Sequence, residues 1–326
     1  MKKILVLVAL LVSFSLFSLE EIAKEVKNAP KKKMTEGVKG NLSVSSNFIL
    51  NDSRSVIGQQ DGYNMTLGFA IKGGVSYVKK ANEVQFNLDI SEQFSRTPEL
   101  ERFIKSSDLA KFDLSYLYSI STVWGPFAKA SFETSLLEGK NETLNEVEYL
   151  VPDEENKITD SMKLVSSLQP MILKQTAGVF YRPIKKEAIN FQLNVGGGAM
   201  EVIADGGMIV NDDAATVDLI ELTKLKSYNE FGSSIFMKVN GLVKSVSVIN
   251  YSATLELMTP FLNDDDQDRG AFELTNIDFT LTLSSKITSW LSLNYELKIT
   301  KTPQLLDEFQ IKNNIMLSLN YMLLGK

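Results

Sequence analysis

The acidic segment NDDDQDRG, residues 263–270, contains the side chains whose spacing most resembles a metal site. Carboxylates stand at the first, third and fifth positions of a calcium-binding loop: Asp264, Asp266 and Asp268. The sixth position, which needs glycine, is Arg269, and the twelfth is Thr275 where a glutamate should bind. We therefore favour an ordinary solvated acidic loop over a calcium site, and we predict no metal and no cofactor.

The composition excludes the commonest hydrolytic mechanisms. Ser–His and Asp–His hydrolases need a base whose pKa is near neutrality, and the chain contains no His and no Cys. A Ser–Lys pair remains an alternative, although the sequence distinguishes no such pair. The glycine run GGGAM, which begins at Gly196, lacks the Lys and the Ser or Thr of a phosphate-binding loop and indicates a bulge or bend. We predict that the protein is not an enzyme.

Charged side chains recur on one face of segments in which polar and apolar residues alternate. This face holds Lys72, Glu83, Asp89, Lys111, Asp113, Lys129, Glu133, Lys174, Glu230, Lys238, Glu256, Asp278, Glu296, Lys298 and Lys312. The two signs nearly balance. A pathway selective for one kind of ion usually has an excess of one sign, whereas balanced charges inside an enclosure can close on one another. We therefore favour a lumen narrowed or closed by ion pairs over an open general pore, the alternative being charges that only solvate the wall.

The elements that must position these charges are long β-strands. Apolar residues alternate with polar ones in each, which is the period of a strand with two different faces. We expect about twelve: 41–50, 64–78, 83–95, 109–121, 124–135, 171–181, 189–199, 229–239, 246–257, 277–283, 291–299 and 309–323. Most are longer than the roughly 5 to 6 residues that are usual in soluble proteins, and they suit a tilted strand that crosses a bilayer in about 9 to 11 residues.

The connections between these segments alternate in length. Short turns follow the second, fourth, sixth, eighth and tenth strands, whereas longer loops follow the first, third, fifth, seventh, ninth and eleventh. This alternation is typical of outer-membrane barrels, with short periplasmic turns and long external loops. Both tryptophans, Trp124 and Trp290, stand beside short turns, where an aromatic girdle would lie, and we assign Tyr77, Tyr295 and Tyr321 to the girdles as well.

These patterns together predict an all-β protein: a transmembrane antiparallel up-and-down β-barrel of about twelve strands in the outer membrane of a Gram-negative cell. The apolar strand faces would contact lipid and the charged faces would enclose a polar lumen. The alternative is a soluble exported β-protein, which explains neither the strand lengths nor the unequal loops.

The N-terminus predicts export. Residues 1–18 combine two lysines, a short apolar run and small residues, as in a cleaved signal peptide, and an uncleaved anchor is the alternative. Residues 19–39 would form a periplasmic lead and residues 40–326 the barrel. The lysines at positions 31–33 could touch an anionic surface, although a solvated linker is favoured. The net charge of −6 argues against nucleic acid as a partner.

Three blocks of sequence resemble a family of uncharacterised outer-membrane β-barrel proteins common in Bacteroidota. They are SSDLAKFDLSYLYSISTVWGPFAKASFETSLLEG at residues 106–139, SSLQPMILKQTAGVFYRP, and the closing FQIKNNIMLSLNYML. Near the first strands the chain has NFILNDSRSVIGQQDGYN where such relatives carry Asn-Trp and Gly-Gly. The resemblance implies the barrel architecture and no activity, because fold alone does not give function.

The last strand alternates Leu317, Leu319 and Tyr321, as in the segment that the outer-membrane barrel-insertion machinery recognises. The expected partners are therefore that machinery and outer-membrane lipid. For function we expect a narrow channel for small polar solutes or ions. The alternatives are a structural or surface-interaction barrel with a closed lumen and, less favoured, a membrane-embedded hydrolase.

Overall fold

The computed structural model describes residues 36–53, 62–97, 100, 102–211, 219–244, 248–265, 267, 269–288 and 290–325. The signal peptide and most of the lead segment lie outside the described residues. The described part contains sixteen β-strands. None of its segments forms a helix long and apolar enough to cross a membrane.

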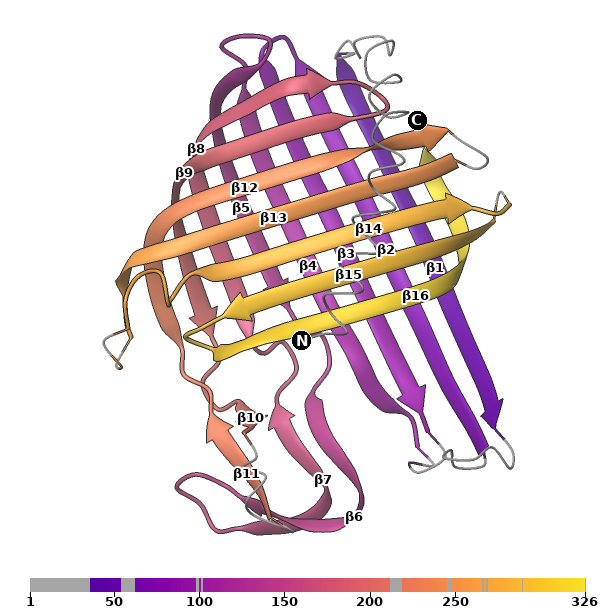
Figure 1. Ribbon diagram of the computed structural model, residues 1–326, viewed down its shortest axis with the longest axis vertical. Helices are drawn as coiled ribbons and strands as arrows, with labels where there is room; N and C mark the ends of the chain where they lie inside the picture. Colours follow the sequence, from indigo (N-terminus) through magenta and orange to yellow (C-terminus); the bar gives the residue numbers. More distant parts are fainter. Residues whose placement is uncertain are drawn as a thin grey trace, which may run out of the picture.

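Twelve of the strands close into an antiparallel barrel (Figure 1), which confirms the predicted fold class. They are β1 (Gly37–Ser53), β2 (Gly62–Lys79), β3 (Asn82–Arg96), β4 (Ile104–Tyr118), β5 (Trp124–Thr134), β8 (Met171–Lys185), β9 (Asn190–Ile203), β12 (Tyr228–Lys244), β13 (Val248–Asn263), β14 (Asn276–Lys286), β15 (Leu291–Thr302) and β16 (Leu306–Gly325). Each matches one of the twelve predicted segments. β1 pairs with β16 and so closes the ring.

The barrel differs from prediction at the start of its first strand and at its last connection. β1 begins at Gly37, inside the segment predicted as periplasmic lead. The predicted loop between the last two strands is a tight turn, in which the Leu305 amide donates to the Thr302 carbonyl at 2.9 Å. We call the end that carries the short connections at 80–81, 119–123, 186–189 and 287–290 the turn end, and the opposite end the loop end.

Four further strands, which lie in segments predicted as loops, form a separate sheet at the loop end (Figure 1). They are β6 (Gly139–Leu150), β7 (Lys157–Val165), β10 (Met208–Val210) and β11 (Leu219–Lys224), in the order β10-β11-β6-β7. This loop-end sheet has its own small core, where Tyr149, Val151, Met162 and Leu222 are buried. β11 pairs with β6 in parallel and thereby joins the β5–β8 connection to the β9–β12 connection.

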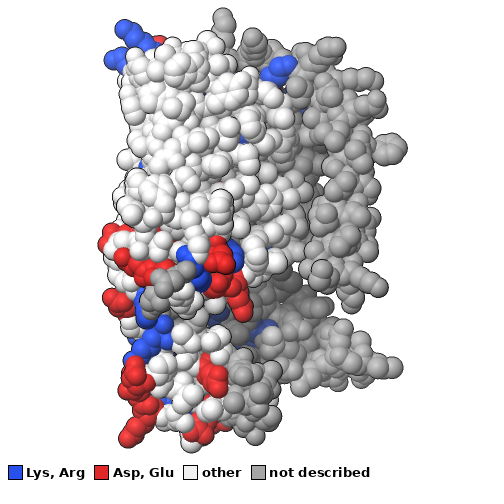
Figure 2. All heavy atoms as spheres, turned by 60° about the vertical axis from the view of Figure 1, so that its left-hand side comes forward, with Lys and Arg blue, Asp and Glu red and all other residues white. Residues whose placement is uncertain are grey.

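The outer wall of the barrel is apolar, because alternate side chains on each strand point away from the lumen. Leu114, Val179, Ile235 and Leu293 are examples that remain exposed. Figure 2 shows the result as a broad surface almost free of charged side chains, with charges gathered at the two ends.

Glycines allow β8 and β9 to pack closely. Gly178 pairs with Gly196, and a Cβ atom at Gly196 would lie only 2.0 Å from the Ala177 carbonyl oxygen. Strand pairing continues without interruption through Gly196 on both sides. The predicted bulge at this run is therefore wrong, and the glycines serve the close approach of two backbones instead.

Candidate functional site

The lumen is crossed by ion pairs between opposite walls. Lys111 on β4 lies 3.2 Å from Glu133 on the neighbouring β5 and 4.0 Å from Asp278 on β14. Lys298 on β15 reaches Glu133 from the far side at 3.2 Å. In the closed order of strands, β14 stands opposite β4 and β15 stands opposite β5. At this level the opposite walls are therefore close enough for lysine and carboxylate side chains to meet across the lumen.

A second group of contacts surrounds Glu256 on β13. Its carboxylate lies 3.3 Å from the Lys174 ammonium and 3.5 Å from that of Lys129. Lys129 is also 3.5 Å from Asp113 on β4. The result is a half-buried cluster of two lysines and two carboxylates, to which β4, β5, β8 and β13 each contribute one side chain.

The third group lies towards β2 and is wetter. Lys72 is 3.0 Å from Asp89 on β3 and 3.8 Å from Glu296 on β15. The Lys72 side chain is 50% exposed, whereas that of Lys111 is 26% exposed. We call the three groups together the ion-pair belt, which consists of Lys72, Asp89, Lys111, Asp113, Lys129, Glu133, Lys174, Glu256, Asp278, Glu296 and Lys298.

Cavities lie on both sides of the belt. The turn-side cavity has a volume of about 560 Å³ and extends from Lys111, Glu256 and Asp278 to the β8–β9 turn at 185–187. The loop-side cavity, of about 220 Å³, is lined by Glu133, Lys298 and the opposite side of Glu256 and Asp278. The same belt residues therefore contribute to both cavities.

The loop end of the lumen becomes apolar on one side. Inward-facing side chains are polar nearer the turn end, whereas here they are the buried Met200, Val202 and Met258. Leu305 from the β15–β16 turn packs against them. Beside this apolar cluster, Glu230 accepts hydrogen bonds from Asn276 and from Gln304. Of the predicted charges, Glu230 is thus placed in a buried amide cage and not in the belt.

Arg182 is a buried lumen residue that the sequence reasoning missed. Its Nη1 donates to Glu83 at 3.0 Å, and its Nε and Nη2 donate to the Gln192 carbonyl oxygen at 3.0 and 2.6 Å. The predicted strand ended at residue 181, whereas β8 continues to Lys185. Arg182 has the same parity as Lys174, so a longer strand assignment would have placed it on the charged face.

Two predicted lysines line the cavities without joining the belt. Lys238 on β12 faces the turn-side cavity, and Lys312 on β16 faces the loop-side cavity. Within the described residues, neither ammonium has a carboxylate at ion-pair distance.

Aromatic side chains gather on the outer wall near the turn end. Trp124, Trp290 and Tyr77 are exposed there, whereas Tyr295 is half-buried and farther along its strand. The side chain of Tyr321 lies outside the described residues. Further exposed tyrosines at this level were not predicted, namely Tyr116, Tyr118 and Tyr181. Amphipathic rings at one level mark a membrane–water boundary.

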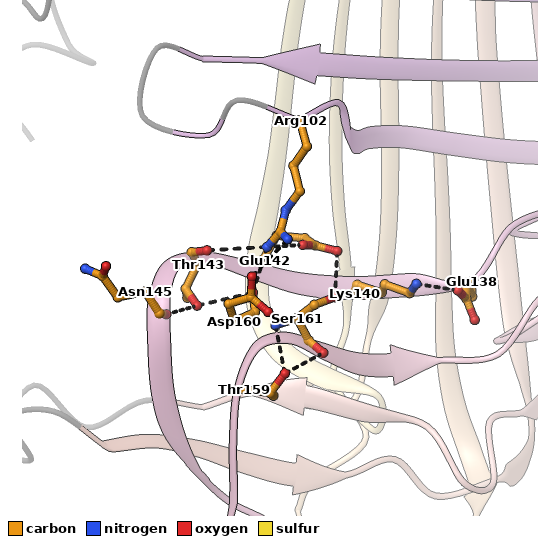
Figure 3. A network of polar contacts seen from close by, with 9 residues as sticks. All are labelled: Arg102, Glu138, Lys140, Glu142, Thr143, Asn145, Thr159, Asp160 and Ser161. Atoms are coloured by element: carbon orange, nitrogen blue, oxygen red, sulfur yellow. Dashed lines mark hydrogen bonds and ion pairs between the residues drawn. The ribbon is translucent and has the colours of Figure 1, made fainter.

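An arginine from the β3–β4 loop holds the loop-end sheet (Figure 3). Arg102 contacts Glu142 on β6 at 2.6 Å and Asp160 on β7 at 3.0 Å, and it also donates to the Asp160 carbonyl oxygen at 3.0 Å. Nearby, a hydrogen bond from Lys140 lowers the pKa of the Glu138 carboxyl. The loop-end sheet is therefore attached to a barrel loop other than the two that form it.

The acidic loops use their carboxylates in local contacts. Asp264 accepts a hydrogen bond from the Asn229 amide at 2.9 Å, while Asp266 and Asp268 lie outside the described residues. Arg269 binds Asp265 at 2.6 Å, and this hydrogen bond lowers the pKa of Asp265. Among the described residues no group of three potential ligands is arranged to hold a metal ion.

No protein-family model and no curated protein sequence matches the chain. In the solved structures, it is similar to the β domain of the Bordetella autotransporter Brka, with 6% identity and a TM-score of 0.35, covering 88% of this chain and 99% of that one. It is also similar to an outer-membrane channel from Pseudomonas putida, with 12% identity and a TM-score of 0.36, covering 90% of this chain and 96% of that one. The translocator domain of autotransporter NalP from Neisseria meningitidis is similar with 8% identity and a TM-score of 0.34, covering 96% of each chain. At such low values these similarities say nothing of function.

The barrel's own structure decides where it resides. Its closed ring leaves no unpaired strand edge, as a β-structure in a bilayer requires. Its outer wall is a broad surface almost free of charged side chains, and many large apolar side chains are exposed on it, as expected of a wall that contacts lipid. The chain is therefore an integral outer-membrane β-barrel, as predicted.

Proposed function

We propose that this barrel is a narrow, non-enzymatic channel for small polar solutes or ions. The observation that supports the proposal best is the presence of cavities of about 560 and 220 Å³ on the two sides of the ion-pair belt. Side chains from opposite walls form the barrier, and side chains change rotamer within picoseconds to nanoseconds where water reaches them. A barrier of this kind opens without unfolding any strand.

The direction of the channel follows from its ends. Short turns face the periplasm in bacterial barrels. The turn-side cavity would therefore open towards the periplasm, and the loop-end sheet would stand outside the cell. The side of the belt at Lys72 is exposed to water, so a solute that passed there would lose the least of its hydration. The absence of His and Cys from the whole chain supports the non-enzymatic role.

A surface-interaction barrel with a closed lumen is the second candidate. The apolar cluster at Met200 and Met258 narrows the loop end. The loop-end sheet also presents exposed apolar side chains, among them Leu144 and Ile158. Exposed apolar groups on an external sheet are typical of contact surfaces.

Planar-bilayer recording of the purified full-length barrel separates the two functions. A channel gives unitary current steps, and Lys111→Gln changes their size because it removes a charge from the belt. Leu114→Ile, three residues away on the lipid face, is the matched control and should leave the steps unchanged. Absence of steps from both the wild type and Lys111→Gln would contradict the channel and favour the closed barrel.

A further inference from the structure

We propose that the turn-side cavity is a binding site for small oxyanions, such as solutes that carry a phosphate or carboxylate group. This inference rests on the proposed channel and names its solute class. It begins from the uneven distribution of charge along the lumen. The belt has five lysines and six carboxylates, but the described wall of the turn-side cavity carries seven Lys or Arg side chains and five Asp or Glu side chains.

The carboxylates of this wall are already bound to cations. Glu83 holds Arg182 at 3.0 Å, and Asp113 holds Lys129 at 3.5 Å. At the mouth of the cavity, Glu187 lies 3.4 Å from Lys244. Each of these acids has a cation at ion-pair distance, although Asp113 shares Lys129 with Glu256, so the acids offer little attraction to a second cation.

Lys238 is a cation of this wall that none of these pairs includes. Its neighbours across the two strand ladders are Gln192 and Thr254, neither of them acidic. The Gln192 carbonyl oxygen accepts two hydrogen bonds from Arg182, and the Gln192 amide group donates to Asn194 at 2.9 Å. The amide oxygen beside Lys238 is therefore occupied.

The environment strengthens attraction for an anion. Lys238 is half-buried, and Lys129 lies on the same cavity wall with its ammonium 5.1 Å from the centre of the Phe236 ring. A cation inside a protein wall is screened less than one at the surface, so its interaction with a small anion is stronger. Charge-assisted hydrogen bonds from an ammonium to phosphate or carboxylate oxygens satisfy the donors that the protein leaves open.

The loop-side cavity repeats the arrangement on a smaller scale. Lys312 lies in its wall, again without a carboxylate at ion-pair distance among the described residues. An anion that crosses the belt would thus leave one lysine and meet another. This arrangement predicts a channel that prefers anions and a main binding site at Lys238.

Inorganic phosphate is the probe for the site. The purified full-length barrel, in a maltoside detergent that contains no phosphate, is added to inorganic phosphate, and the broadening of the phosphate's phosphorus NMR line is measured. Saturable binding is expected for the wild type. Lys238→Gln should weaken it about tenfold, the loss of one charge-assisted hydrogen bond of roughly 1.4 kcal/mol. Lys157→Gln, which changes an exposed lysine of the loop-end sheet, is the control, with binding close to wild type, and Lys238→Arg should retain binding.

Bilayer recording in a potassium chloride gradient gives the second readout. The wild type should show a chloride-to-potassium permeability ratio of about 3 or more, which Lys238→Gln brings towards unity. Phosphate binding without any conductance would support the site and contradict the channel. Conductance with a preference for potassium, or no saturable phosphate binding by the folded wild type, would overturn the anion site.

Discussion

The Lys298 ammonium on β15 and the Glu133 carboxylate on β5 lie 3.2 Å apart, although their strands stand on opposite sides of the barrel. Glu133 also binds Lys111 beside it. One carboxylate therefore fastens two lysines from opposite walls. This makes Glu133 the residue whose removal tests the belt most directly.

Glu133→Gln should open the belt. Loss of the carboxylate leaves Lys111 and Lys298 without their shared partner, and their repulsion widens the space between the walls. Unitary conductance should rise by about twofold or more in bilayers. Glu154→Gln is the control, since Glu154 is exposed between β6 and β7, outside the belt, where it lies 2.8 Å from Lys157. Equal conductance in the wild type and both variants would show that the belt does not limit permeation.

Arg182→Met should destabilise the barrel strongly. The Arg182 and Glu83 side chains are only 7% and 9% exposed, so the substitution leaves a buried carboxylate uncompensated. Breaking one partner of such a pair costs about 3 to 5 kcal/mol in free energy of unfolding. The double variant Arg182→Met with Glu83→Gln should recover much of this loss. Urea unfolding in detergent, followed by gel mobility, measures both effects, and equal instability of single and double variants would contradict the pairing.

Gly196→Ala should disturb the close approach of β8 and β9. The added Cβ would meet the Ala177 carbonyl oxygen at 2.0 Å, which requires the backbone to move. Overpacking of this kind costs about 1 to 3 kcal/mol. Gly197→Ala is the matched control, because a Cβ added there would come no nearer than 3.6 Å to the Phe231 ring. The prediction fails if the two variants unfold at the same urea concentration.

Arg102→Gln should loosen the loop-end sheet without affecting the barrel. It removes contacts with both Glu142 and Asp160 while leaving the barrel strands paired. The free energy of local opening should then fall by roughly 1 kcal/mol. Limited proteolysis of the folded protein should therefore cut within β6 or β7 several times faster. Lys157→Gln, which removes an exposed pair with Glu154, is the control. Unchanged cleavage in Arg102→Gln would indicate that the sheet is held by its own core.

The contact between Asp265 and Arg269 should be lost at acidic pH. Its hydrogen bonds lower the pKa of Asp265 below the ordinary value of about 3.9. A lowered pKa in the folded state means that the contribution to stability is fully present above pH 4 and disappears as pH falls through the lowered pKa. The Arg269 amide donates to Asp265 at 3.0 Å, so its hydrogen-exchange protection factor reports the contact. Asp265→Asn should remove this pH dependence, and an identical profile in the variant would contradict it.

Sequence periodicity predicted the barrel well because a two-residue period places side chains on one of two faces irrespective of distant contacts. It therefore predicted that Lys111 and Lys298 share an interior. It did not predict that both meet Glu133, since that depends on the stagger of the strands and on the distance between opposite walls. Arg182 was missed because the predicted strand ended at residue 181, whereas β8 continues through Pro183 to Lys185.

The loop-end sheet was missed for a different reason. β10 has only three residues, and β11 gains its place from parallel pairing with a strand of another loop. Local periodicity carries little information about such short strands, and their pairing depends on contacts between distant segments. Which acidic residues bind Arg102 likewise follows from this tertiary arrangement.

The parallel pairing of Leu219–Lys224 with β6 also imposes an order on assembly. The hairpin of β6 and β7 is local in sequence and is able to form early. β11 is separated from β6 in sequence by β7 to β10, and it belongs to a connection that β8 and β9 carry away from β5. We therefore expect the loop-end sheet to be completed late in folding, and protection of the β11 amides from hydrogen exchange would report when β8 and β9 have joined β5.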